Sequence, residues 1–314
     1  MIKLERYTTE MRGEWDKVVD DSRNATFLHR RDFMDYHRDR FADCSLIARD
    51  SRGRIVALLP CCRQTCNVVS HAGLTYGGWL MSTHHADAAI MLEVTNALVT
   101  TLRSEGVKQL IYKPVPSIYH RVPSQEDLYA LWRHGAQVSA LGLSSTIDIG
   151  HRVPFDRGNR RNVNLALRQG VAVGPSDDWA TYWQLLSDVL RRQHGVDPVH
   201  TLDEIRLLHS RFPENISLHT ATLEGDIVAG VVMFDTPQVA HAQYIAAGQR
   251  ARTCGALALL FDRLITRAEA AGQRYFDFGI STEHGGATLN EGLIAQKTRF
   301  GGRPTLYPTL TLQL

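Results

Sequence analysis

The chain has 314 residues, of which 44% are hydrophobic and 22% are charged, and its 35 Lys and Arg residues nearly balance 33 Asp and Glu residues. This composition is typical of a globular protein with one large or two modest domains. The charge balance gives no reason to expect a nucleic-acid-binding surface, and no apolar run reaches the roughly 18 residues of a membrane span.

The N-terminal stretch MIKLERYTTEMRGEWDK is charged from its start and lacks the apolar core of a signal peptide, so we expect a cytoplasmic protein. The five cysteines include three in the stretch CCRQTC, without a matching C-x-x-C pair elsewhere. This pattern argues against a disulfide framework and against a zinc site. We expect no bound metal, and we expect Cys61 and Cys62 to be small buried residues at the end of the strand IVALLPCC.

Two triplets are similar to motifs of protein kinases. His37-Arg38-Asp39 matches the catalytic-loop triplet and Asp277-Phe278-Gly279 matches the magnesium-binding triplet, but about 240 residues separate them. No glycine-rich loop followed by a V-A-I-K lysine is present to hold ATP. A kinase is therefore excluded.

Two pairs of segments repeat along the chain. Residues 45–57, SLIARDSRGRIVA, align without a gap with residues 217–229, SLHTATLEGDIVA, and each reads as two strands around a tight glycine turn. Residues 89–106 align with residues 255–272, and each reads as a helix that ends at a glycine. In the second helix, apolar residues recur at helical spacing and predict one buried stripe of Leu257, Leu260, Phe261, Leu264, Ile265 and Ala268.

Each half is therefore predicted to run helix, helix, strand, strand, strand, helix, strand, with helices covering a mixed sheet. Thr201 and Glu204 form the pattern of a capping box at the start of one helix in the second half. We predict a mixed α/β fold of two tandem domains, 1–148 and 149–314, related by internal duplication.

This order of elements and three motifs resemble the FemAB-like (FemABX-related) acyltransferases, which carry two GNAT-like domains in tandem. The first motif is SHAGLTYGGWL at 70–80. The second, RRNVNLALRQG at 160–170, is similar to the basic R-R-N-x-x-K-A helix start of the family. The third is FDFGISTEHGGATLNEGLIAQKTRFG at 276–301, which ends in a segment similar to F-K-x-x-F-G and carries Lys297.

The resemblance implies transfer of an activated acyl group to an amine. One branch of the family uses aminoacyl-tRNA to extend peptidoglycan precursors; another uses acyl-CoA to acylate amino sugars, including nucleotide-linked sugars for surface polysaccharides. The tRNA-dependent enzymes often carry a long helical arm, whereas residues 177–211 are predicted to hold two short helices, and RGNRRN is the one basic tract. We therefore favour acyl-CoA as cosubstrate, with no permanently bound cofactor, and keep a tRNA-dependent ligase and a non-catalytic binding module as alternatives.

The resemblance also implies a place for the donor, where the fourth and fifth strands of the second domain separate. Its pyrophosphate would lie at the start of the next helix, where backbone N–H groups are unpaired. The family pattern Q/R-x-x-G-x-G/A is matched by Arg252 and Gly255 and broken at Leu257. The candidate donor-binding residues are Gln243, Ile245, Ala247, Arg250, Arg252, Gly255, Ala256 and Lys297.

The equivalent loop of the first domain has no glycine and contains Asp87, so we expect that domain to have lost donor binding and to hold the acceptor. Asp277 alternates with two phenylalanines, so we expect it on the opposite face of the sheet, where a buried carboxylate needs a partner. The candidate substrate-binding residues are Tyr76, Lys113, Tyr119, His120, His194 and Asp277.

Formation of an amide requires a base that accepts the proton of the attacking amine. The sequence offers Glu283 and His284 after the fifth strand, and His200 between the first two helices of the second half. Tyr244 on the fourth strand is the candidate proton donor to the leaving thiolate. An alternative covalent route would use Cys254, since a thiol at a helix N-terminus has a lowered pKa.

Overall fold

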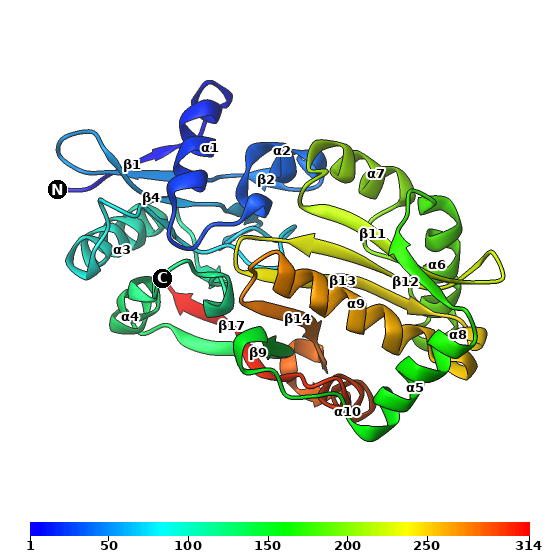
Figure 1. Cartoon of the computed structure of the whole chain (residues 1–314). Coiled ribbons are helices and arrows are strands. Elements are labelled where there is room, and N and C mark those ends of the chain that lie inside the picture. The colour runs from blue at the N-terminus through cyan, green and yellow to red at the C-terminus, as the bar shows by residue number, and fades with distance from the viewer. The chain divides into compact units, whose positions relative to one another are not determined.

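The computed structural model describes residues 1–314, except for the side chain of His194. Two compact units make up the chain, whose elements are labelled in Figure 1. Unit 1 comprises Met1–Gly142, His284–Thr288 and Leu306–Leu314, and unit 2 comprises Leu143–Glu283 and Leu289–Thr305.

The predicted domains 1–148 and 149–314 stay a prediction, and the first division between the compact units lies close to the predicted boundary. The division falls inside strand β9 (Gln137–Asp148), and the end of the last strand, β17 (Arg303–Gln313), returns to unit 1. There β17 pairs with β8 (Gln109–Tyr112) in antiparallel register. The internal similarity could not reveal this return, because the repeated segments all lie before residue 290.

Unit 1 contains two sets of paired strands, in the orders β1-β3-β4-β7 and β17-β8-β6-β5-β2. Its remaining elements are β1 (Lys3–Arg6), α1 (Arg12–Asp21), α2 (Arg31–Met34), β2 (Ala42–Asp43), β3 (Leu46–Arg49), β4 (Ile55–Leu59), β5 (Cys62–Gln64), β6 (Asn67–Val69), β7 (Leu80–Met81), α3 (Ala88–Ser104) and α4 (Glu126–Arg133).

Unit 2 contains the strands β10-β11-β12-β13-β14-β9 in that spatial order. Every neighbouring pair described among them is antiparallel except β13 and β14, which are parallel. The elements after β9 are α5 (Arg157–Arg168), β10 (Ala172–Pro175), α6 (Trp179–His194), α7 (Leu202–Arg211), β11 (Ile216–Leu223), β12 (Asp226–Asp235), β13 (Val239–Ala247), α8 (Gln249–Cys254), α9 (Ala256–Ala270), β14 (Tyr275–Ile280), β15 (Thr282–Glu283), β16 (Thr288–Leu289) and α10 (Glu291–Arg299). The predicted mixed α/β fold is confirmed.

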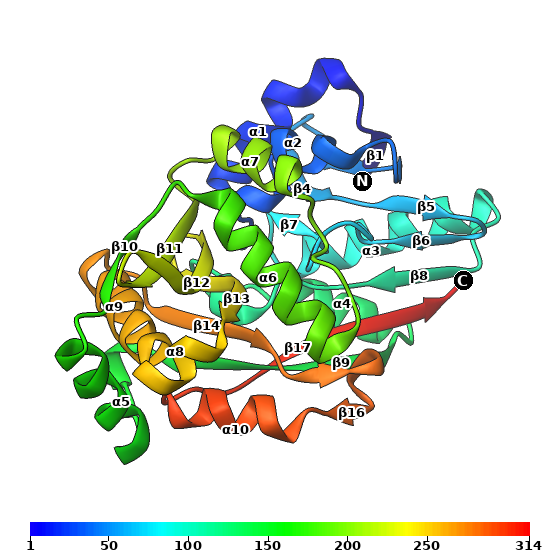
Figure 2. The same cartoon turned by 90° about the vertical axis from the view of Figure 1, so that its right-hand side faces the viewer.

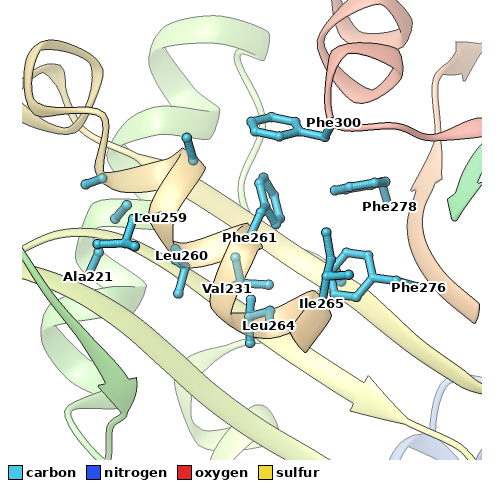
Figure 3. Close-up of a cluster of buried hydrophobic side chains, with 14 of the residues drawn as sticks. Ala221, Val231, Leu259, Leu260, Phe261, Leu264, Ile265, Phe276, Phe278 and Phe300 are labelled. Atoms are coloured by element: carbon cyan, nitrogen blue, oxygen red, sulfur yellow. The ribbon is translucent and has the colours of Figure 1, made fainter. Parts of the chain in front are cut away.

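Helix α9 covers one face of the unit 2 strands, and its predicted apolar stripe is buried there. Figure 3 shows Phe261 of α9 between Phe276 and Phe278 of β14 and Phe300, which follows α10. The ring centres of Phe261 and Phe278 are 5.1 Å apart, in the edge-to-face geometry that aromatic pairs prefer. Helix α6 packs against β12 and β13 from the other face, as Figure 2 shows.

The repeated segments form the same local structures in both units. Gly53 and Gly225 both have positive φ at the turns of their hairpins, and Gly106 and Gly272 both have positive φ just past a helix. In each unit a parallel pair of strands is connected by the segment that contains the repeated helix: β6 and β8 in unit 1, where β7 also lies between β6 and α3, and β13 and β14 in unit 2. The capping box of Thr201 and Glu204 is present at the start of α7.

Gly255, which precedes α9, is required by the packing of the helix. It has φ +75°, and an added Cβ would lie 2.3 Å from the carbonyl oxygen of Asn162 in α5. We expect Gly255→Ala to lower the free energy of unfolding by roughly 2–4 kcal/mol, through backbone strain and the clash with α5. Gly272→Ala is the matched control, since Gly272 has φ +74° with open space around it, and its cost should be about 1 kcal/mol. Urea unfolding of both variants measures the difference, and equal losses would contradict the packing role.

Candidate active site

The edge between β13 and β14 opens partway along the two strands. They pair through only three residue pairs, the last of which is His241 with Asp277. Beyond this point β13 continues to Ala247 and β14 to Ile280 without pairing to each other. Beyond His241 and Asp277, the backbone groups of β13 and β14 that face each other are therefore not paired in the sheet. The resemblance predicts that the acyl donor binds between two strands that separate in this way.

A register shift lies at the same place in β13. Val232 of β12 faces Tyr244, but Met233 faces Ala242, so Gln243 is an extra residue in β13. Such a bulge leaves the extra residue outside the regular ladder and bends the strand. It also changes which side chains of β13 face α9.

His241 and Asp277 form a hydrogen-bonded pair where the opening begins. Nδ1 of His241 lies 2.8 Å from Oδ2 of Asp277. The other carboxylate oxygen accepts hydrogen bonds from the hydroxyls of Ser144 and Thr146, at 2.6 and 2.8 Å. The backbone N–H of Gly279 donates to Oδ2 at 3.2 Å. The carboxylate is fully buried, and these bonds confirm that it lies on the face opposite the two phenylalanines and has partners.

The pKa of Asp277 reflects two opposed effects. Burial alone would raise the pKa of this carboxyl, but the bonds from His241, Ser144 and Thr146 and the charge of the imidazole hold it below its ordinary value. The group is therefore a carboxylate at neutral pH. It accepts a hydrogen bond from Nδ1–H of His241, and in the neutral imidazole this bond selects the tautomer that has its lone pair on Nε2.

The second ring nitrogen of His241 is available for chemistry. The side chain is 14% exposed, and no described residue is hydrogen-bonded to Nε2. The imidazole Cε1 lies close to Gly279, where an added Cβ would come within 3.5 Å of it. Gly279 has φ +77°, so β14 turns away from β13 beside the ring.

Lys297 of α10 holds the end of β14. Its Nζ donates hydrogen bonds to the carbonyl oxygens of Gly279 and Ile280, each at 2.8 Å. Burial lowers the pKa of Lys297 to about 8, although the Asp277 carboxylate opposes the shift. The predicted donor-binding lysine is thus a buried contact of the strand that borders the opening.

Lys297 should make stability depend on pH in the alkaline range. Between the folded pKa of about 8 and the ordinary value of 10.5, the unfolded chain binds more protons than the folded one at this group. The free energy of unfolding therefore rises with pH across this window, by roughly 3 kcal/mol in total from this group. Lys297→Met should lack this contribution and keep only that of Lys113, whose pKa burial also lowers to about 8, whereas Lys108→Met, at an exposed lysine, should keep both. The measurement is urea unfolding of wild type and both variants at about pH 7.5 and about pH 10, near the ends of the window. An equal change in the free energy of unfolding between the two pH values in all three proteins would contradict the role of Lys297.

Two predicted catalytic residues contact each other. The hydroxyl of Tyr244 lies 2.5 Å from Nδ1 of His200, and the backbone N–H of His200 also points to it at 3.3 Å. Both residues are 8% exposed. The ring of Trp183 in α6 packs edge-on against Tyr244, with centres 5.2 Å apart. The pair lies on the α6 side of β13.

The other two predicted bases are exposed. Glu283 accepts a hydrogen bond from the Asn290 side chain at 3.0 Å. His284 has φ +50°, and its Nδ1 lies 3.3 Å from the Thr288 hydroxyl. Their roles stay predictions.

The expected phosphate-binding residues lie in and just after helix α8. Arg252 lies within helix α8, Gly255 is in contact with α5, and Ala256 is fully buried. Arg250 forms ion pairs with Glu224 and Asp226, at 2.7 and 2.6 Å. The Cα of Gly255 lies against the backbone of α5 at Asn162, and the predicted contact of Gly255 and Ala256 with a pyrophosphate stays a prediction.

The remaining donor candidates, Gln243, Ile245 and Ala247, are half-buried on the part of β13 that is unpaired with β14. Ile245 and Ala247 pack against the core under α9, and Gln243 lies at the bulge. Cys254 is buried with its thiol toward the Ala251 carbonyl, which argues against the covalent route.

In unit 1, the predicted acceptor residues are largely buried. The rings of Tyr76 and Tyr119 are 4.7 Å apart, and each residue is 3% exposed. Nζ of Lys113 donates to the Leu74 carbonyl at 2.6 Å, and burial lowers the pKa of Lys113 to about 8. Nε2 of His120 lies 2.9 Å from the Val115 carbonyl. The side chain of His194 lies outside the described residues.

His241 is the site residue that sequence reasoning missed. The signal was present, because Asp277 required a partner and His241 is the one titratable residue between 239 and 243 of the neighbouring strand. The partner of Asp277 depends on the parallel register of β13 and β14. In this register Val239 lies opposite Tyr275, which places His241 opposite Asp277. The described residues contain no cluster of His, Cys, Asp and Glu suited to a metal ion. Among them, no helix is long and apolar enough to cross a membrane.

Comparisons with known proteins identify a domain in the second half of the chain and support the fold. Residues 157–285 match the model of the acetyltransferase (GNAT) domain, a segment that includes β13, β14 and the His241–Asp277 pair. Among curated proteins, none is similar enough in sequence to count as a match.

Solved structures share the fold along the whole chain at low identity. FemX has a TM-score of 0.70 and 14% identity, covering 99% of this chain and 97% of its own. The C-terminal domain of a putative lysylphosphatidylglycerol synthetase from Agrobacterium fabrum has a TM-score of 0.61 and 15% identity, with coverages of 96% and 92%. A tandem GNAT protein from the clavulanic acid biosynthesis pathway has a TM-score of 0.52 and 12% identity, with coverages of 100% and 98%. The chain therefore contains a GNAT acetyltransferase domain and is an acyltransferase.

Proposed function

We propose that the chain forms amides by transferring an acyl group to an amine in the opening between β13 and β14, with His241 as the base. The observation that supports this is the His241–Asp277 pair, which lies where the two strands separate and in which no described residue is hydrogen-bonded to Nε2 of the imidazole. His241 is the catalytic residue in this proposal and Asp277 is its positioning residue.

The reaction balances with a thioester donor. The amine nitrogen attacks the thioester carbonyl carbon and its proton passes to Nε2 of His241, so that the C–N bond forms as the C–S bond breaks. The leaving thiolate takes a proton and departs as the free thiol. We infer that the backbone N–H at the Gln243 bulge, which the ladder does not use in a regular way, stabilises the oxyanion. Tyr244, bonded to His200, remains our candidate proton donor to the thiolate.

We propose acyl-CoA as the donor, because the matched domain is a GNAT acetyltransferase domain. The acceptor that we propose is the amino group of an amino sugar, nucleotide-linked and destined for surface polysaccharide, acylated in the cytoplasm. The acceptor rests on the resemblance in sequence and on the aromatic and polar residues of unit 1, Tyr76, Tyr119, Lys113 and His120. We also propose that the two units arose by duplication. In this proposal unit 1 binds the acceptor and unit 2 binds the donor.

One observation favours a second candidate, an aminoacyl-tRNA donor for a cell-wall precursor. The family pattern of the CoA pyrophosphate loop is broken at Leu257, and an acyl-tRNA would not need that loop. The structures with similar folds include FemX and the C-terminal domain of a putative lysylphosphatidylglycerol synthetase.

A donor panel separates the two candidates. The protein is incubated with acetyl-CoA or longer acyl-CoAs and UDP-linked amino sugars, or with charged tRNA and a UDP-linked muramyl peptide, and products are identified by mass spectrometry. An acylated amino sugar that disappears in His241→Ala supports the first candidate. Product from charged tRNA alone would replace the first candidate by the second, and product formed equally well by His241→Ala would remove the proposed base.

A further inference from the structure

Two thiols of unit 1 lie against each other beside the β3–β4 hairpin. The Sγ atoms of Cys44 and Cys61 are 3.5 Å apart. The backbone N–H of Cys44 donates to the Cys61 carbonyl at 2.9 Å, and the Cys61 thiol donates to the Cys44 carbonyl at 3.0 Å. The two backbones are therefore neighbours, and the side chains point toward each other.

The two thiols differ in access and in acidity. Cys61 is fully buried, whereas Cys44 is half-buried. The Cys61 thiol, and beyond it the Arg6 guanidinium, lower the pKa of Cys44 against the effect of its burial. Burial raises the pKa of Cys61. Arg6 is held in place by bonds of 2.5 Å to the Cys44 carbonyl and to the Glu105 carboxylate. Cys44 is thus the attacking thiolate, and Cys61 is the thiol that resolves it.

We propose that Cys44 and Cys61 are a peroxide-sensitive dithiol that closes to a reversible disulfide. The Cys44 thiolate attacks the O–O bond of hydrogen peroxide and forms a sulfenic acid, and hydroxide leaves. The Cys61 sulfur then attacks the Cys44 sulfur, expels water and forms the S–S bond. Two thiols and one peroxide give one disulfide and two waters, and an added dithiol reverses the reaction.

The disulfide would join two segments that carry other contacts of unit 1. Asp43, next to Cys44, is paired with the buried guanidinium of Arg31. Cys62, next to Cys61, accepts a hydrogen bond from the backbone of Ala72 at 3.2 Å. A Cys44–Cys61 disulfide would therefore link the segment that forms the Arg31 ion pair covalently to the segment that contacts the loop after β6. This modification is independent of the proposed acyl transfer, so either can fail without the other.

The test is peroxide titration of the full chain, followed by thiol counting and mass spectrometry of non-reduced peptides. We expect loss of two of the five thiols, a mass lower by two hydrogen atoms, and recovery with dithiothreitol. Cys44→Ala and Cys61→Ala should each abolish the disulfide. Cys66→Ala, at an exposed cysteine, and Cys62→Ala should leave the Cys44–Cys61 linkage intact.

A second measurement guards against variants that fold poorly. Arg6→Gln should slow oxidation of Cys44 several-fold, whereas Arg6→Lys should keep most of the rate, because the positive charge favours the thiolate. Five thiols retained after peroxide, a disulfide through Cys62, or oxidation of Cys44 to the sulfinic acid with Cys61 untouched would each overturn the proposal.

Discussion

His241→Ala is expected to lower kcat for amide formation by roughly 10²–10⁴-fold, with a much smaller effect on KM. The variant removes Nε2, to which no described residue is hydrogen-bonded. Proton transfer from the amine then has to go to water, and the chemical step slows while binding of the donor is preserved. Added imidazole should restore part of the rate, because the substitution leaves space beside Gly279. Initial rates with the donor identified by the panel measure the effect.

His151→Ala is the matched control, since His151 is an exposed histidine of the same unit, with 86% of its side chain accessible. It should retain full activity. Circular dichroism and thermal unfolding must show that His241→Ala is folded before its rate is interpreted. If kcat of the folded variant stays within about threefold of wild type, another group is the base, and Glu283, His284 and His200 become the next candidates.

The local structure of the chain could be predicted where the deciding contacts are close in sequence. The stripe of α9 and the glycine that ends it are both contained in residues 255–272, and both are found as expected. The same is true of the capping box of α7 and of the face on which Asp277 lies, which its two phenylalanine neighbours determine.

The site could not be predicted in full, because it depends on contacts between distant segments. The partner of Asp277 follows from the parallel register of β13 and β14, and the hydroxyls that bond its other oxygen come from Ser144 and Thr146 of β9, about 130 residues away. The contact of Gly255 with the Asn162 carbonyl also lies outside the local motif, because Asn162 belongs to helix α5, about 90 residues earlier in the chain. A local sequence pattern can therefore identify a required residue without identifying the distant residue that it contacts.

Asp277→Asn is the second substitution with a large expected effect, and it acts through His241. An asparagine amide would donate a hydrogen bond to Nδ1 instead of accepting one, so the imidazole proton would move to Nε2 and the lone pair would be lost from the opening. We expect kcat to fall by roughly 10²–10⁴-fold, as for other bases that lose their orienting carboxylate. The double variant His241→Ala/Asp277→Asn should be no slower than His241→Ala alone, because the two residues act as one unit. Additive losses would show that Asp277 acts by another route.

Stability measurements and the Ser144→Ala variant distinguish a structural role of Asp277 from its effect on the tautomer of His241. The pKa of Asp277 lies below its ordinary value, so the carboxylate stabilises the fold above that ordinary pKa and loses this contribution as pH falls through the folded value. Asp277→Asn should therefore remove part of the acid sensitivity of unfolding. Ser144→Ala removes one hydrogen bond to the same carboxylate but leaves its bond to His241, so it should destabilise the protein by about 1 kcal/mol and change kcat little. If Ser144→Ala and Asp277→Asn reduced kcat to the same extent, the loss would come from the disturbed fold and not from the tautomer of His241.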